Sequence, residues 1–224
     1  MSYLRNGSNY ILNFYKMVDY RQLDNLLLTE KPKTIFEFGT FDGTDTLHYS
    51  NLLPDAEIWT FDADKRSVGK IKKKIDGRNI HAYHYAITDH CGKVAFYTST
   101  FTDGEPGCSG SIKKHTRFHK KNQIGRQIFS DIPIFVPAMT IEKFCLDNNI
   151  ERIDFLHSDT EGNVEEVING FGKFLPGILR IEIYEISSNY EGVMSHSYYD
   201  NIIRSLGYEY LFGIEYDAVY KLKS

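Results

Sequence analysis

The stretch TIFEFGTFDGTDT, residues 34–46, decides the fold. It opens with a short apolar run that contains Glu37, continues through two glycines four positions apart, Gly39 and Gly43, and ends in small hydroxyl and acidic residues. A buried strand, a glycine turn and the start of a helix give this pattern, and such units form a ligand crevice at the carboxyl edge of a parallel sheet. We expect a cofactor-binding turn here. The alternative is a strand, turn and helix that bind no ligand.

Phe41 helps to choose between cofactors. A dinucleotide-binding turn reads G-x-G-x-x-G, and its second glycine lets bare backbone approach a pyrophosphate. Phe41 occupies that position, so NAD and FAD fit poorly. S-adenosylmethionine has no phosphate, and needs an acid near its amino group, close backbone and a second acid for its ribose. Glu37 and the turn offer the first two, and Asp62, 19 residues past Gly43, ends the next predicted strand where a ribose acid belongs.

A third predicted strand leads into YAITDHCG, residues 85–92. Asp89 and the backbone near Ala86 and Ile87 are expected beside an adenine, and the alternative is a polar turn closed by Gly92. The full set of predicted cofactor-binding residues is Glu37, Gly39, Thr40, Phe41, Gly43, Thr46, Asp62, Ala63, Ala86, Ile87, Asp89 and Asp159.

Strands and helices alternate along most of the chain, which predicts an α/β fold with a mostly parallel sheet and helices on both faces. The tail, residues 208–223, reads as two strands around a turn, so a closing hairpin would put one antiparallel strand in that sheet. We expect a helical segment over residues 1–32 that Pro32 ends, and one domain over residues 33–224. Thr44 or Asp45 is expected to cap the helix after the first strand.

A second acidic group, in IDFLHSDTEGNVEEVINGF at residues 153–171, falls where a later parallel strand should end. His157, Asp159 and Glu161 alternate and so face one way on an extended chain, and Glu182 ends the following strand. Methyl transfer from a sulfonium to a hydroxyl needs a base, so we predict His157, Asp159 and Glu161 as catalytic residues. Asp159, Glu161 and Glu182 are also conceivable ligands of a divalent metal. The alternative is that Asp159 and Glu161 cap the helix that begins near Asn163.

A basic insertion around residues 100–135 interrupts the alternation. It could grip an anionic acceptor such as a phosphorylated or nucleotide-linked sugar, and RNA is a further option because Phe118 could stack among the cations. A solvated loop is the alternative. The predicted acceptor-binding residues are Ser109, Ser111, Lys113, Lys114, Arg117 and Glu182.

Composition sets the outer limits. The chain has 224 residues, with 26 Lys and Arg against 30 Asp and Glu, so its net charge of −4 gives no global attraction to nucleic acid or acidic membranes. No apolar run approaches the ~20 residues of a membrane helix, and no signal-peptide pattern opens the sequence. The three cysteines have no metal-ligand spacing. We therefore expect free thiols and a cytoplasmic protein, and the oligomeric state stays open.

From about Thr34 to the C-terminus the chain resembles the FkbM-type S-adenosylmethionine-dependent methyltransferases. The resemblance lies in FEFGTFDGTDT, FDAD, AITDHCG, GCSGS, TIEKF and, most specifically, IDFLHSDTEGNVEEVINGF. It implies a Rossmann-like, seven-stranded class I methyltransferase sheet with a reversed last strand, and methylation of hydroxyls, often on sugars or polyketide-type products. His157 replaces a Lys common in the family block, Val164 replaces an acid, and Ala63 replaces a proline.

These observations favour an S-adenosylmethionine-dependent O-methyltransferase acting on a carbohydrate or glycan-type acceptor. One alternative is an RNA methyltransferase, which the basic insertion favours and the net charge does not. The other is a non-catalytic S-adenosylmethionine-binding protein.

Overall fold

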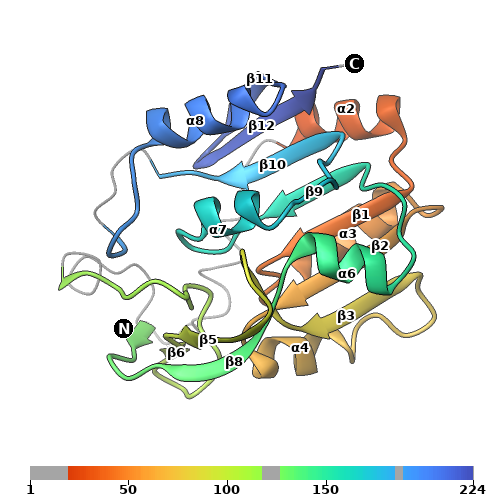
Figure 1. Ribbon diagram of the computed structural model, residues 1–224. Helices are drawn as coiled ribbons and strands as arrows, with labels where there is room; N and C mark the ends of the chain where they lie inside the picture. The colour runs from red at the N-terminus through yellow and green to blue at the C-terminus, as the bar shows by residue number, and fades with distance from the viewer. Residues whose placement is uncertain (1–19, 118–126, 185–188, 224) are drawn as a thin grey trace, which may run out of the picture.

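A mixed sheet with seven strands forms the centre of the computed structural model, which describes residues 20–117, 127–184 and 189–223 (Figure 1). The strand order is β11-β12-β10-β9-β1-β2-β3. Neighbours from β10 to β3 pair in parallel, and β12 runs antiparallel to both β10 and β11. The predicted α/β class and the reversed last strand are therefore confirmed. The strands of this main sheet are β1 (Thr34–Phe38), β2 (Glu57–Asp62), β3 (Ile80–His84), β9 (Phe155–Ser158), β10 (Ile178–Glu182), β11 (Tyr208–Ile214) and β12 (Asp217–Leu222).

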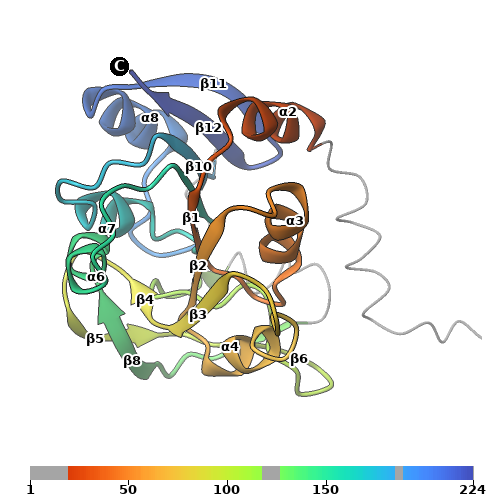
Figure 2. The same cartoon turned by 90° about the vertical axis from the view of Figure 1, so that its right-hand side faces the viewer.

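Helices cover both faces of the main sheet, as the edge-on view of Figure 2 shows. One face carries α2 (Arg21–Glu30), α3 (Thr44–Leu52) and α4 (Lys65–Ile71). The other carries α6 (Ile141–Asp147), α7 (Val164–Asn169) and α8 (His196–Ser205). A parallel sheet needs this double cover because its strands are apolar on both sides. None of the helices in the described ranges is long and apolar enough to cross a membrane.

Strand β1 shows how the sequence divides the core between the two faces. Successive side chains of a strand point to opposite faces. Phe36 and Phe38 accordingly enter the larger apolar cluster, in which Phe144 of α6 contacts Phe36 edge-on at 5.9 Å between ring centroids. Ile35 points the other way and joins the second cluster with Leu27 of α2. All three β1 side chains are at most 1% exposed, so β1 is anchored from both sides and its carboxyl end has a fixed position.

The predicted third strand divides into two. β3 stays in the main sheet, whereas β4 (Ala86–Ile87) turns away and pairs in parallel with β8 (Ile134–Met139), which also pairs antiparallel with β5 (Gly92–Phe96). A separate two-stranded sheet pairs β6 (Ser99–Phe101) antiparallel with β7 (Gln127–Phe129), so both strands belong to the region of the basic insertion. These small sheets lie below β3 in Figure 1, next to the carboxyl edge of the main sheet.

Two predicted boundaries need comment. The predicted helical segment over residues 1–32 lies mostly outside the described residues, of which α2 is the part that the structure shows. The predicted cap of α3 is wrong: neither Thr44 nor Asp45 caps it, because Gly43 takes the N-cap position with a φ of 79°. Asp42 supplies the local acceptor instead, and its Oδ1 accepts a hydrogen bond from the Thr44 backbone N at 3.0 Å.

Candidate functional site

Gly39 joins the ends of two neighbouring strands. It follows β1, its φ is 79°, and a Cβ at this position would lie 1.7 Å from the Asp159 carbonyl oxygen. Only glycine fits so close an approach, and only glycine adopts this φ at no steric cost. The Asp159 backbone N donates to the Phe38 carbonyl at 2.9 Å, which ties the two strand ends together. The glycine turn and the second acidic group of the sequence therefore meet at the same edge of the sheet.

A cleft of about 570 Å³, partly open to solvent, lies at this edge. This volume includes space that is open to solvent. Apolar walls such as Phe61 and Phe96 alternate with the polar side chains of Asp62, Asp159 and Asn163. Seven of the predicted cofactor-binding residues line it: Gly39, Phe41, Asp62, Ala63, Ala86, Ile87 and Asp159.

Asp62 is held in place by backbone groups. Its Oδ2 accepts from the Phe41 backbone N at 2.8 Å, and its Oδ1 accepts from the Asp64 backbone N at 2.7 Å. Asp62 is 8% exposed, and this burial raises the pKa of its carboxyl to about 7. An ionised carboxylate has about four acceptor positions. Asp62 thus retains acceptor capacity for ligand hydroxyls after both backbone bonds are made.

Phe41 adopts a backbone conformation that is rare for its type. Its φ is 47°, which is unfavourable for a residue with a Cβ. The bond to Asp62 holds the backbone in this state, and the ring contacts Phe101 of β6 with 6.4 Å between centroids. The bulky ring that argues against a pyrophosphate therefore borders the cleft and contacts the insertion.

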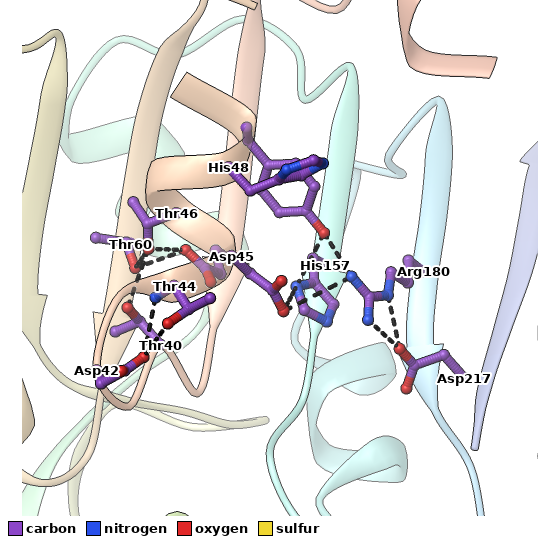
Figure 3. A network of polar contacts seen from close by, with 12 residues as sticks. Thr40, Asp42, Thr44, Asp45, Thr46, His48, Thr60, His157, Arg180 and Asp217 are labelled. Carbon is purple, nitrogen blue, oxygen red and sulfur yellow. Dashed lines mark hydrogen bonds and ion pairs between the residues drawn. The ribbon is translucent and has the colours of Figure 1, made fainter. Parts of the chain in front are cut away.

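Glu37 lies behind the cleft rather than on its wall. It is 2% exposed and accepts hydrogen bonds from the hydroxyls of Thr46 and Thr60, the latter at 3.2 Å. Burial raises the pKa of Glu37 to about 8. Thr40 completes this hydroxyl cluster through a 3.1 Å contact with Thr46 (Figure 3). Like these residues, Gly43 and Asp89 are absent from the cleft lining, and exposed Asp89 pairs with His90 at 2.7 Å.

His157 is buried in a charged network on the α3 side of the sheet (Figure 3). It is 2% exposed, and its Nδ1 lies 3.3 Å from the Tyr49 hydroxyl and 3.8 Å from Asp45 Oδ2. Arg180 of β10 donates to the same Tyr49 hydroxyl at 2.7 Å and pairs with Asp217 at 2.6 Å. Burial, followed by the charge of Arg180, lowers the pKa of His157 well below its usual value. The ring is therefore neutral near pH 7, and it is not part of the cleft lining.

Asp159, Glu161 and Glu182 converge as the sequence predicts. Each offers a carboxylate oxygen, and the three atoms lie within 4.8 Å of one another. Burial, and then the neighbouring carboxylate, raises the pKa of both Asp159 and Glu182 well above the ordinary range. Glu161 accepts from the hydroxyl of Tyr184 at 2.6 Å and from that of Tyr190. The group could share protons or hold a hard divalent cation, which prefers oxygen ligands.

The alternative role of these acids as helix caps does not appear. α7 begins at Val164, its N-cap is Asn163, and no side chain caps it. Glu161 has a φ of 55°, so the chain turns sharply just before the helix. The Glu161 carbonyl accepts from Ser111 Oγ at 2.6 Å, which fastens the insertion to this turn.

Among the predicted acceptor-binding residues, Ser111 lines the cleft. Ser109 is buried beside it, and Lys113 forms an ion pair with Glu166 of α7. The ammonium group of Lys113 is thus already paired with a carboxylate and is less available to an anionic acceptor. The Lys114 carbonyl accepts from the Glu191 backbone N at 2.8 Å, and Arg117 is exposed. Phe118, Lys120, Lys121 and Arg126 of the insertion lie outside the described residues.

Two residues of this region escaped the sequence analysis. Arg180 lies inside a strand that reads as apolar, although it shares its strand face with paired neighbours His157 and Glu37. The shared strand face of these three residues could have indicated a polar cluster there. Asn163 looked like a helix start, but its side chain bonds to the Ile87 carbonyl, 76 residues away, at 2.7 Å. No local pattern in the sequence predicts that contact.

Comparison with known proteins connects this geometry to a family. The profile of the methyltransferase FkbM domain matches residues 37–210. The 2-O-methyltransferase NoeI of Sinorhizobium fredii is 29% identical over 156 residues, which are 67% of this chain and 62% of that protein. The matched region thus spans less than two thirds of that relative's length.

A solved methyltransferase structure shows the same fold. A protein described as a caffeoyl-CoA O-methyltransferase from Staphylococcus aureus superposes with a TM-score of 0.50 at 11% identity, over 98% of this chain and 93% of that one. The O-methyltransferase TomG from Streptomyces achromogenes, solved with S-adenosylmethionine, gives a TM-score of 0.46 at 10% identity, over 91% and 79% of the two chains. The fold is that of the class I methyltransferases. With the family profile matched from the end of β1 into β11, this chain belongs to the methyltransferase FkbM domain family.

Proposed function

We propose that this protein is an S-adenosylmethionine-dependent O-methyltransferase that acts on a hydroxyl of a carbohydrate or glycan-type acceptor. One observation carries the proposal. Gly39, Asp62 and Asp159, from the ends of three neighbouring strands, line a single cleft. The same cleft brings together close backbone, a candidate ribose acid and a candidate base.

The ribose and the sulfonium of the donor would each meet a carboxylate at the cleft. The ribose hydroxyls would donate to Asp62, whose position two backbone N–H groups already fix. The sulfonium would lie toward Asp159, near the turn at Gly39. A positive sulfur there is attracted by the carboxylates of Asp159, Glu161 and Glu182, and it would in turn lower the raised pKa values of Asp159 and Glu182. The 4.8 Å spacing of these oxygens concentrates that attraction at one point.

Asp159 is the candidate general base. Transfer forms the oxygen–methyl bond as the sulfur–methyl bond breaks, the electron pair of the broken bond goes to sulfur, and the acceptor hydroxyl loses its proton. Asp159 lines the cleft and could take that proton once it is ionised. His157 is less suited, because it is 2% exposed and surrounded by Tyr49, Asp45 and Arg180.

The acceptor side is acidic and aromatic. Glu161 binds the hydroxyls of Tyr184 and Tyr190, whose rings lie 5.9 Å apart. Carboxylates accept hydrogen bonds from sugar hydroxyls. A polyanion such as RNA would be repelled by the three carboxylates. The name of the relative NoeI, a 2-O-methyltransferase, agrees with transfer to oxygen.

A labelled-methyl assay tests this proposal. The protein is incubated with methyl-labelled S-adenosylmethionine and separate pools of sugars, nucleotide sugars and RNA, with EDTA or added Mg²⁺ in parallel samples. We expect label in a carbohydrate pool, and a fall of at least about 100-fold in kcat for Asp159→Asn, the lower end of what a general base contributes. Asp147→Asn is the matched control, since Asp147 pairs with Lys143 on the surface of α6. Label found in RNA alone would contradict the proposed acceptor.

A further inference from the structure

Asn163 presents an unsatisfied acceptor at the cleft. It is 2% exposed and belongs to the residues that line the cleft. Its Nδ2 donates to the Ile87 carbonyl at 2.7 Å, which fixes the plane of the amide. Its Oδ1 is buried and accepts no hydrogen bond from any of the residues that the structure describes. A buried acceptor left without a donor destabilises the folded protein, so the arrangement calls for a donor from a ligand.

A local structural role does not account for this side chain. An Asn at a helix N-cap usually accepts from a backbone N–H of the first turn. Asn163 occupies the N-cap position of α7 but its side chain makes no such bond. The amide instead reaches across to β4, the short strand that leaves the main sheet after β3. The side chain is therefore oriented by the wall of the cleft and not by its own helix.

The position of Asn163 selects one part of the donor. The methionine end of S-adenosylmethionine is expected near Gly39 and Asp159, and its ribose near Asp62. The base would then extend along the wall that Ala86 and Ile87 form. Asn163 is attached to that wall at Ile87, so its Oδ1 is placed to meet the rim of the base. Asp89, predicted beside the adenine, is exposed and paired with His90.

We propose that Asn163 Oδ1 accepts a hydrogen bond from the exocyclic amine of the adenine, and that this residue makes the cleft selective for a 6-aminopurine nucleoside. The inference rests on the proposed function, because it assumes that the cleft holds S-adenosylmethionine. A site that hydrogen-bonds a ligand N–H rejects the analogue lacking it, since the acceptor stays unpaired. One neutral hydrogen bond of this kind corresponds to about a tenfold preference or more.

A cycle of two ligands and two proteins tests the inference. Calorimetry compares S-adenosylhomocysteine with its 6-deamino analogue, the purine riboside, on wild type and on Asn163→Ala. We expect wild type to prefer the amino ligand at least tenfold, and Asn163→Ala to bind both within about twofold. Asp62→Asn is the matched control: it should weaken both ligands by the same factor and keep the preference. Thermal melting checks that each variant is folded.

Each outcome has a separate meaning. Wild type that binds neither ligand defeats the proposed function itself. Wild type that binds both ligands equally, or Asn163→Ala that keeps the preference, overturns the role of Asn163 alone. Unchanged affinity for S-adenosylhomocysteine together with a raised KM for the acceptor would also overturn it, by giving the amide to the acceptor. If Asn163→Ala does not fold, Asn163→Ser takes its place, because a serine hydroxyl can still donate to Ile87.

Discussion

Replacement of Asp62 by asparagine should remove the pH dependence of nucleoside binding. Burial raises the pKa of Asp62 to about 7 in the free protein, whereas hydrogen bonds from ribose hydroxyls favour the ionised form. Binding therefore releases a proton below pH 7. Since the carboxyl must ionise first, wild-type affinity for S-adenosylhomocysteine should fall about tenfold for each pH unit below 7 and level off above it.

The structure also bounds the loss of affinity in Asp62→Asn at pH 8, where the wild-type carboxyl is ionised. Asparagine keeps one acceptor oxygen for the two backbone donors, Phe41 N and Asp64 N, which are 2.8 and 2.7 Å from the carboxylate. The amide then has little acceptor capacity left for the ribose. Loss of one hydrogen bond to a charged group is worth about 1.5–3 kcal/mol, which predicts a rise in Kd of about 10- to 150-fold.

Calorimetry in buffers of different ionisation enthalpy measures both quantities. It gives the Kd and the number of protons released, here about one half per site at pH 7. S-adenosylhomocysteine is the suitable ligand because its sulfur is neutral, so Asp159 and Glu182 respond to it less. A wild-type Kd that stays constant from pH 5.5 to 8, or a pH dependence that survives in Asp62→Asn, would refute the assignment of Asp62 to the ribose.

Two further predictions concern the frame of the site. Gly39→Ala should lower the free energy of unfolding by at least about 2 kcal/mol in urea titrations, because its Cβ would lie 1.7 Å from the Asp159 carbonyl oxygen and its φ of 79° disfavours any side chain; an unchanged midpoint would contradict the close approach. Glu37 has a pKa of about 8 in the folded state against 4.5 ordinarily, so its contribution to stability is complete below pH 4.5 and is lost as the pH rises to 8, by about 1.4 kcal/mol per unit. Glu37→Gln should remove that slope from the pH profile of unfolding, and an unaltered profile would show that Glu37 is ionised in the folded protein.

The mostly parallel character of the main sheet and its reversed last strand could be predicted because they depend on local patterns. β1 is a short apolar run followed by Gly39, and the tail reads as two strands around a turn. These patterns predict the parallel strands and the reversed β12. The division between β3 and β4 could not be predicted from the sequence. Residues 79–89 have the composition of one strand, and only the pairing of β4 with distant β8 shows that the chain leaves the sheet at Tyr85.

The sequence predicts which residues lie at the strand ends of the site, but it does not predict the direction in which their side chains point. Asp62 and Asp159 were expected at the cleft, and both line it. Glu37 and His157 were expected there too, yet each lies on the α3 face and bonds to residues of that face. A motif gives the residue at which a strand ends. Whether its side chain faces the ligand depends on the helix packed against that face, and Thr46 and Tyr49 of α3 decide it here.

The distribution of charge at the carboxyl edge explains why a cationic donor suits this protein. Arg180 is buried between Asp217 and Asp45, and it holds β10 to the start of the reversed strand β12. Its positive charge favours ionisation of Asp159, but burial and the charge of Glu161 outweigh it, since the pKa of Asp159 stays raised. A sulfonium bound near Asp159 would supply the missing positive charge. Under the proposed function, transfer of the methyl group would remove that charge, so the same carboxylates that attract the donor would hold its neutral product less firmly and could accept the proton that the acceptor releases.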